Sequence, residues 1–453
     1  MAPTAPEIIL RRLNEGPAAS AELERLLGQS QSSTSRLLRD LLSRNEIIRL
    51  GATRGARYAR LRAIEGIGSQ WPLRRVDEDG GIHDLGTLRA LAGSVYYLES
   101  SARDFAHAGT SSGLPYFLQD QRPAGFLGRT VPARYPELQL PQRVIDWNDD
   151  HYLRYLTQHG SDSMSDLILG DAALDGYLAS LRRPPDVRED ERAVRYPQIA
   201  DEVTQGGYAG SSAHGEHPKF AISLQRAGTG VRHVLVKFSP PGTTQVGERW
   251  ADLLVAEHLA HQVLADAAIP AASSRVERWG NRMFLEVDRF DRAGAFGRIG
   301  VTSLLAIDSA SYGTLDNWID SAERLRRDGR IESATLEQVR LVATFGALIA
   351  NSDRHFGNIA FFDRYDKRFS LAPVYDMLPM LFAPEHDQVA TRAFAPPDPT
   401  SLTLRAYARA RELAERYWRR CSEDGRISAA FRRICADCLG ALEAMPRSGA
   451  FGG

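Results

Sequence analysis

The sequence has no long apolar stretch and only three cysteines, and each of these shortages excludes a class of protein. No apolar stretch approaches the roughly 20 residues needed to cross a bilayer, and the start, MAPTAPEIILRRLNE, lacks the basic first part and long apolar core of a signal peptide. The three cysteines are Cys421, Cys435 and Cys438, and no histidine follows Cys421 to complete a four-ligand zinc site. We therefore expect a cytoplasmic protein without membrane contact, whose cysteines are ordinary reduced thiols.

Lysine is also scarce. Of the 56 basic residues, only Lys219, Lys237 and Lys367 are lysines, which leaves 53 arginines. Arginine and lysine differ in geometry and hydration, so a lysine kept in such a chain indicates a position where a compact ammonium is wanted. For Lys367, in the polar turn DRYDKR, chance is a sufficient explanation.

The length of 453 residues is too great for one ordinary core and predicts two to four domains. We divide the chain into residues 1–62, 63–205, 206–295 and 296–453. The second segment mixes short strand and helix patterns and carries no recognisable chemistry. Within it, RRPPDVREDERAVRYPQ (182–198) has the charge and proline content of a loop or mobile segment.

Residues 1–62 have the order of a winged helix-turn-helix, with three helical patterns followed by a short hairpin around Gly55. They hold 11 arginines, no lysine, five glutamates and one aspartate, a net charge of +5 against −1 for the whole chain. This charge predicts DNA binding. We place Ser33, Arg36 and Arg39 on the recognition helix and Arg54 and Arg57 on the wing. A module that contacts only proteins is the alternative.

Residues 206–240 contain a loop rich in glycine and serine, then two strand patterns, KFAISLQ and RHVLVKFS, joined by a turn. Small residues let backbone N–H groups approach phosphate oxygens. Lys237 lies within an apolar strand, where an ammonium is costly unless an anion meets it. We therefore favour a phosphate that binds the Lys237 ammonium. The alternative is a lysine whose aliphatic stem is buried and whose ammonium reaches solvent.

The stretch LVATFGALIANSDRHFGNIAFF (341–362) is an apolar run that ends in a cluster of polar residues. An apolar hairpin after Asn358 could return Asp376 close to Asp353. Phosphoryl transfer needs a carboxylate that orients the attacking hydroxyl, and carboxylate or amide oxygens that hold Mg²⁺ on the nucleotide phosphates. Turn and cap residues are the alternative reading, since Asn and Asp favour such sites. The sequence as a whole predicts an α+β chain with a two-lobed nucleotide-binding body.

The motifs GSSAHGEHPKF, HVLVKF, EVDRFDR, ANSDRHFGNIAFF and LAPVYDMLP resemble, in this order, those of the HipA family of serine/threonine kinases, toxins of type II toxin-antitoxin systems. The resemblance covers roughly residues 85–440 and implies a two-lobed protein-kinase-like fold. The fused N-terminal module resembles the YjjJ-type subgroup. A separate antitoxin is therefore an open question.

The resemblance implies roles for single residues, with ATP and Mg²⁺ as cofactors. Asp353 would be the catalytic aspartate, Asn358 and Asp376 the Mg²⁺ ligands, and Lys237, Gly215 and His355 nucleotide-contacting residues. Ser212, or its neighbour Ser211, would be the autophosphorylation site that switches the kinase off. His214 departs from the small residue expected in this loop.

The resemblance also implies a protein substrate in translation or growth, with an aminoacyl-tRNA synthetase as one candidate that no residue here selects. Two other functions remain open. The protein could be a transcriptional regulator whose kinase-like body senses nucleotide, or a small-molecule kinase, because an Asp and an Asn five residues apart also serve those enzymes.

Overall fold

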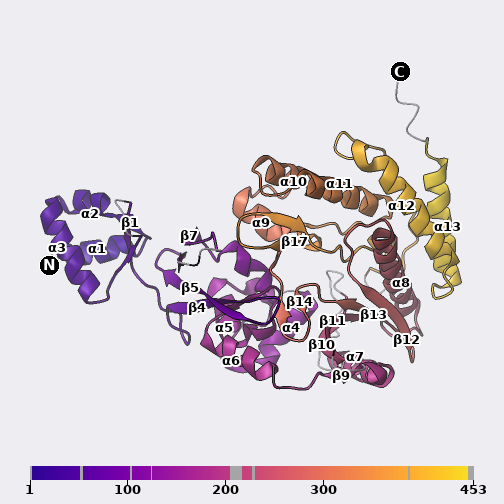
Figure 1. Cartoon of the computed structure of the whole chain (residues 1–453), viewed down its shortest axis with the longest axis horizontal. Coiled ribbons are helices and arrows are strands. Elements are labelled where there is room, and N and C mark those ends of the chain that lie inside the picture. Colours follow the sequence, from indigo (N-terminus) through magenta and orange to yellow (C-terminus); the bar gives the residue numbers. More distant parts are fainter. Residues whose placement is uncertain are drawn as a thin grey trace. The chain divides into compact units, whose positions relative to one another are not determined.

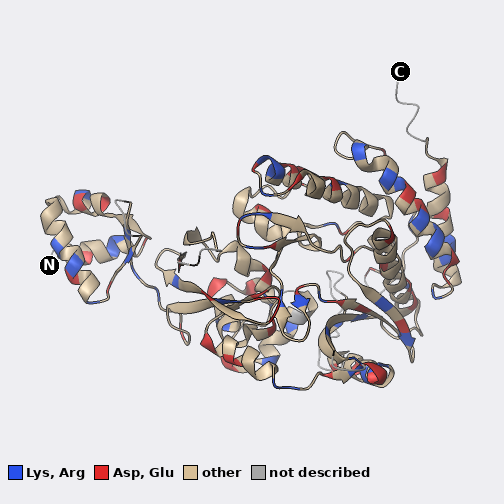
Figure 2. Ribbon diagram, in the orientation of Figure 1, with Lys and Arg blue, Asp and Glu red and all other residues tan. Residues whose placement is uncertain are grey.

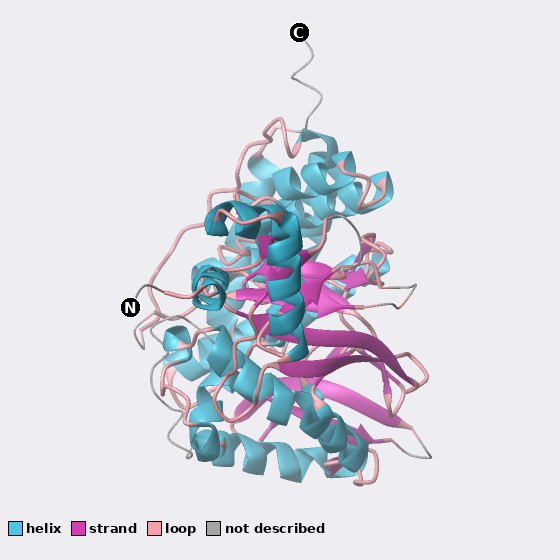
Figure 3. Cartoon of the chain, turned by 90° about the vertical axis from the view of Figure 1, so that its left-hand side faces the viewer, coloured by secondary structure: helices cyan, strands magenta, loops and turns pink. Residues whose placement is uncertain are grey.

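The computed structural model describes residues 3–51, 55–100, 102, 105–123, 125–204, 217–226, 230–385 and 388–446, which fold into two compact units (Figure 1). Unit 1 comprises Met1–Asp77, Gly81–Arg122 and Tyr135–Arg182, and unit 2 comprises Glu78–Gly80, Pro123–Arg134 and Arg183–Gly453. Figure 3 distinguishes the helices and strands of both units. The domain limits at 62, 205 and 295 remain predictions.

Unit 1 begins with three helices and a small sheet, as the sequence predicts. The helices are α1 (Ala5–Leu13), α2 (Ser20–Leu27) and α3 (Gln31–Ser43), and the strands β1 (Ala18–Ala19), β2 (Ile48–Leu50) and β3 (Arg57–Ala59) pair antiparallel in the order β1-β3-β2. Apolar residues three or four apart put one face of each helix inside. The core that results contains Ile9, Leu13, Leu23, Leu38 and Leu41.

The rest of unit 1 is an antiparallel sheet in the order β7-β6-β5-β4-β8, with helices α5 (Asp149–His159) and α6 (Asp171–Ser180) in contact with β8. Its strands are β4 (Gln70–Val76), β5 (Ile82–Leu91), β6 (Val95–Glu99), β7 (Gly109–Ser112) and β8 (Leu167–Leu169).

The first lobe of unit 2 is a sheet in the order β12-β13-β11-β10-β9. Its strands are β9 (Val187–Arg188), β10 (Lys219–Gln225), β11 (Val231–Phe238), β12 (Ser274–Trp279) and β13 (Arg282–Asp288). The antiparallel hairpin of β10 and β11 confirms the one predicted from KFAISLQ and RHVLVKFS, and its register sets Lys219 opposite Lys237. Helices α4 (Gly125–Arg134), α7 (Arg192–Val203) and α8 (Gln245–Asp266) contact this sheet.

The loop predicted for residues 182–198 is wrong in its second half, because residues from Arg192 onward form helix α7. The Tyr196 side chain is fully buried, and its hydroxyl donates to Glu286 at 2.8 Å. Arg192 pairs with the same carboxylate at 3.1 Å. Tertiary contacts of this kind override a charged, proline-containing composition.

The second lobe of unit 2 is mostly helical, as predicted. It contains α9 (Leu304–Ser311), α10 (Trp318–Arg327), α11 (Ser333–Leu348), α12 (Leu404–Glu423) and α13 (Ala429–Ala444), and a sheet of β16 (Val301–Ser303), β17 (Ala360–Asp363) and β18 (Phe369–Leu371). Two short antiparallel strands, β14 (Arg292–Ala293) and β15 (Gly297–Arg298), lie between the lobes in sequence. Helix α11 carries most of the apolar run before the polar cluster, and Leu341, Val342, Phe345 and Leu348 are buried.

No helix among the described residues is long and apolar enough to cross a membrane. The three cysteines are free thiols, buried on α12 and α13.

Candidate active site

Lys237 lies near the end of the central strand β11 and is 6% exposed. Its ammonium donates to both carboxylate oxygens of Glu257, at 2.6 and 2.8 Å, and to Asp376. Burial would lower the pKa of Lys237, but the two carboxylates outweigh burial and hold this pKa above its ordinary value. The anion expected beside the lysine is thus supplied, in this structure, by two acidic side chains.

Glu257 is a site residue that the sequence reasoning missed. It projects from α8, is 1% exposed, and burial raises its pKa although Lys237 opposes the shift. A signal was available, because Glu257 interrupts the apolar run LLVAEHLA on the helix that follows the lysine strand, whereas Glu248 on the same helix is exposed. A charge within an apolar stretch indicates a buried partner.

The polar cluster after α11 folds back on itself. The chain turns at Ala350, whose φ is +58°, and Asn358 then donates from Nδ2 to the carbonyl of Asp353 at 2.8 Å and to its carboxylate at 3.5 Å. The Asp353 side chain is exposed. The structure therefore brings Asp353 and Asn358 together, as the sequence predicts.

The predicted hairpin of β17 and β18 is present. After it the chain returns Asp376 to the polar cluster, where the Asp376 carbonyl accepts from Asn351. Burial would raise the pKa of Asp376, but Lys237 and Lys219 outweigh burial and hold the pKa below its usual range. Asp376 adopts a left-handed conformation with φ of +51°. A short-chain acid tolerates that region better than most residues do.

Asn351, which the sequence reasoning left without a role, joins the two acidic residues. Its side chain is 1% exposed. Oδ1 accepts from the backbone N–H of Asp353 at 3.0 Å, and Nδ2 donates to the carbonyl of Asp376 at 3.3 Å. A second link is the Tyr375 hydroxyl, which donates to the carbonyl of Gly357 at 2.6 Å. Two hydrogen bonds thus tie the Asp353 loop to the Asp376 segment.

His355 has a structural place in the loop. Its Nδ1 accepts from the backbone N–H of Gly357 at 3.0 Å, and its carbonyl accepts from the indole N–H of Trp318 at 3.1 Å. Arg354 donates to the carbonyl of Asn351. A nucleotide contact by His355 remains a prediction, while its contribution to loop geometry is visible.

The residues present suit an Mg²⁺ ion shared with nucleotide phosphates. Asn358 uses Nδ2 as a donor, which leaves Oδ1 available, and Asp376 offers a carboxylate. Mg²⁺ in such sites binds one or two protein oxygens and takes the rest from phosphates and water. Within the described part of the chain, no group of three or more His, Cys, Asp or Glu residues could hold a metal ion by itself.

Several predicted residues lie outside the residues that the structure describes, namely Arg54, Ser211, Ser212, His214 and Gly215. Of the predicted DNA contacts, Ser33, Arg36 and Arg39 are exposed on α3. The guanidinium of Arg57 donates to the carbonyl of Pro17 at 2.7 Å.

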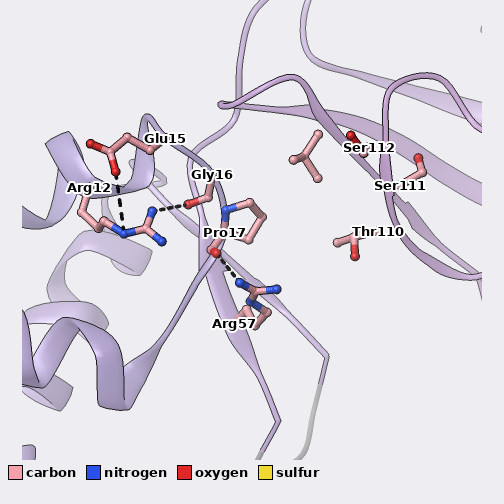
Figure 4. A pocket seen from close by; sticks show the side chains of 9 residues that line it. Arg12, Glu15, Gly16, Pro17, Arg57, Thr110, Ser111 and Ser112 are labelled. Atoms are coloured by element: carbon pink, nitrogen blue, oxygen red, sulfur yellow. Dashed lines mark hydrogen bonds and ion pairs between the residues drawn. The ribbon is translucent and has the colours of Figure 1, made fainter.

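A cavity of about 390 Å³ in unit 1 is lined by Arg12, Glu15, Gly16, Pro17, Arg57, Val95, Thr110, Ser111 and Ser112 (Figure 4). Its arginines are already engaged, because Arg12 pairs with Glu22 at 2.5 Å and Arg57 contacts Pro17. The residues of the candidate active site all belong to unit 2.

Two family models match successive parts of the chain. Residues 67–178 match the family model "YjjJ-like toxin, middle domain", and residues 211–444 match "HipA-like C-terminal domain". The chain is 35% identical to Toxin YjjJ of Escherichia coli K12 over 428 residues, which are 94% of this chain and 95% of that protein. A solved HipA chain, from a Shewanella oneidensis MR-1 complex of HipA, HipB and operator DNA, superposes with a TM-score of 0.54 at 15% identity. That match covers 82% of this chain and 96% of the HipA chain, and it confirms the predicted two-lobed fold.

Proposed function

The chain belongs to the HipA family of toxins, in its YjjJ-like branch, and from this premise we propose that it is an ATP- and Mg²⁺-dependent serine/threonine protein kinase. The observation that carries the proposal is one connected set of side chains. Lys237 is in direct contact with Glu257 and with Asp376, and Asn351 joins Asp376 to the loop of Asp353 and Asn358.

Each group has a task in phosphoryl transfer. The exposed Asp353 carboxylate orients the attacking hydroxyl and accepts its proton. Lys237, fixed by Glu257, offers an ammonium to the phosphates of ATP. Asn358 Oδ1 and the Asp376 carboxylate would hold Mg²⁺, which neutralises charge on the phosphates during transfer. Because this chemistry is mostly positioning and electrostatics, a rigid frame for these groups is the main requirement.

Autophosphorylation at Ser212 or Ser211 is part of the proposal by family resemblance. A translation factor is the proposed substrate class on the same ground. The HipA of the Shewanella complex is named there with HipB, so a separate antitoxin is proposed for this chain as well.

The test is transfer of radiolabelled phosphate from ATP, with Mg²⁺, to the chain itself or to lysate proteins. The wild-type chain should label at least one protein, and Asp353→Ala should lose about 10²-fold or more of that labelling. Equal labelling by both proteins, or none by either, would overturn the kinase proposal.

A second function is DNA binding by residues 1–62, the proposed winged helix-turn-helix. The +5 charge and the exposed Arg36 and Arg39 on α3 favour it. Gel retardation of the chain's own promoter region should weaken in Arg36→Gln/Arg39→Gln. If the wild-type chain retards this DNA but labels no protein from ATP in any assay, a transcriptional regulator that senses nucleotide is the better description.

A further inference from the structure

Six basic residues gather on the helical lobe of unit 2, and we call them the basic surface. They come from the end of α10 and from the turn between β17 and β18 (Figure 2). The two segments lie side by side, because the N–H of Phe369 donates to the carbonyl of Arg330 at 2.8 Å and Ile331 forms a bridge with Phe369. The members are Arg326, Arg327, Arg330, Arg364, Lys367 and Arg368.

The positive charge of this surface is only partly balanced by acids in the same segments. Segments 326–332 and 364–368 contain these six cations and three acids, a net charge of +3. Among the described residues, none of the six forms an ion pair with a carboxylate, whereas the preceding Arg324 pairs with Asp308 at 3.2 Å and with Asp316 at 2.7 Å. Such a field attracts an anionic partner.

The turn that carries half of the surface is well anchored. Tyr365 is 1% exposed, and its N–H donates to the Asp363 carboxylate at 2.7 Å. The N–H of Arg368 donates to Asp366 at 2.9 Å, and the Arg330 guanidinium lies 4.9 Å from the centre of the Phe369 ring. A turn whose backbone is fixed in this way loses less entropy when a partner binds.

Both elements that carry the basic surface begin at the candidate catalytic loop. Trp318, the first residue of α10, donates to the carbonyl of His355, and β17 starts two residues after Asn358. The ten residues of α10 span about 15 Å. The basic surface is therefore separated from the catalytic loop by the length of the ten-residue helix α10 on one side and of the four-residue strand β17 on the other, a span that an extended peptide covers with about five residues.

We propose that the basic surface docks an acidic segment of the protein that receives the phosphoryl group. This inference rests on the proposed kinase function and specifies the substrate class: proteins with several Asp or Glu residues about five or more positions from the modified Ser or Thr. Guanidinium groups suit carboxylates because they donate two parallel hydrogen bonds. The short reach to the catalytic loop favours a substrate segment over a nucleic acid.

The direct test is binding to the full chain, followed by fluorescence anisotropy. The probes are a labelled dodecapeptide of glutamate and serine and an oligouridine of the same length. The variant is Arg327→Gln/Arg364→Gln/Lys367→Gln. The matched control, Arg405→Gln/Arg416→Gln/Arg433→Gln, removes the same charge from exposed arginines of α12 and α13, which form no ion pair among the described residues.

We expect the first variant to bind the peptide about tenfold more weakly, as the loss of three exposed charge contacts implies, with the control close to wild type. Equal effects of the two variants, or no effect, would overturn the proposal. A loss confined to oligouridine would also overturn it and would assign the surface to nucleic acid.

A kinetic test separates docking from the kinase proposal. With a serine peptide that carries an acidic segment, the first variant should raise KM about tenfold and leave autophosphorylation unchanged. An unchanged KM contradicts docking alone. Absence of any phosphoryl transfer by the wild-type chain contradicts the kinase proposal, and the anisotropy result then still decides whether the surface binds acidic peptides.

Discussion

At the scale of single residues, the candidate site combines the exposed Asp353 with polar side chains that are buried beside their partners. Lys237, Asp353, Asn358 and Asp376 could be selected from the sequence, since an ammonium in an apolar strand and acids after an apolar run are unusual. Glu257 and Asn351 were not selected, because their roles lie in contacts that only the fold reveals, and the charge of Glu257 within an apolar run does not name its partner. Glu257 meets Lys237 across 20 positions, and Asn351 meets Asp376 across 25.

The first residue-scale prediction concerns Asn351. Asn351→Ala removes an acceptor from the Asp353 N–H and a donor from the Asp376 carbonyl. We expect the free energy of unfolding to fall by about 1–3 kcal/mol, the usual cost of unsatisfied buried groups. The Mg²⁺ concentration for half-maximal activity should rise, because Asp376 loses its tie to the loop. Urea unfolding and Mg²⁺ titration measure the two effects.

The neighbouring Ser352 supplies the control. It is exposed, and Ser352→Ala should change neither quantity. If Asn351→Ala left the Mg²⁺ dependence unchanged, its side chain would serve stability alone.

At the scale of elements, β11, α8 and the segment after β18 are joined by one buried charge cluster. Lys237→Met leaves Glu257 in the core without its cation. Removing one partner of a buried pair typically costs about 3–5 kcal/mol. We expect a loss of this size in the unfolding free energy at neutral pH, measured by denaturant titration. Lys219→Met, on the adjacent strand and less buried, should cost clearly less.

The effect of Lys237→Met on the unfolding free energy should depend on pH. The folded pKa of Asp376 lies below its unfolded value, so this carboxylate adds stability above about pH 4, and the contribution is lost as pH falls through the folded pKa. Lys237→Met removes the main cause of that shift. The difference in unfolding free energy between wild type and variant should therefore shrink as pH falls below about 4. A difference that is constant from pH 7 to pH 3 would contradict the proposed charge cluster.

Some helices and strands could be predicted from the sequence and one helix, α7, could not. The hairpin of β10 and β11 and the helix α11 followed from local patterns, since alternation and apolar runs are encoded nearby. Helix α7 did not, because its charged, proline-containing sequence is typical of loops. Its order comes from Tyr196 and Arg192, which bind Glu286 about 90 positions away.

At the scale of the whole molecule, a basic N-terminal module of net charge +5 is joined to a body of net charge −6, because the whole chain carries −1. If residues 1–62 bind DNA through phosphates, the logarithm of the binding constant should fall with the logarithm of salt concentration. Removing two phosphate contacts in Arg36→Gln/Arg39→Gln should reduce that slope by about 0.9 per contact. Arg405→Gln/Arg416→Gln in unit 2 should leave the slope unchanged. Identical slopes in all three proteins would exclude α3 as the DNA-contacting helix.

Intact-protein mass spectrometry is the most direct test of whether the chain transfers a phosphoryl group with Asp353 as its catalytic aspartate. The purified chain is incubated with MgATP and a cell lysate, and compared with Asp353→Asn. Because Asp353 is exposed and Asn is nearly isosteric, the variant should fold normally. We predict that the wild-type chain or a lysate protein gains the mass of one or more phosphoryl groups and that Asp353→Asn produces none. The same gain with both proteins, or no gain with either, would contradict phosphoryl transfer that depends on Asp353.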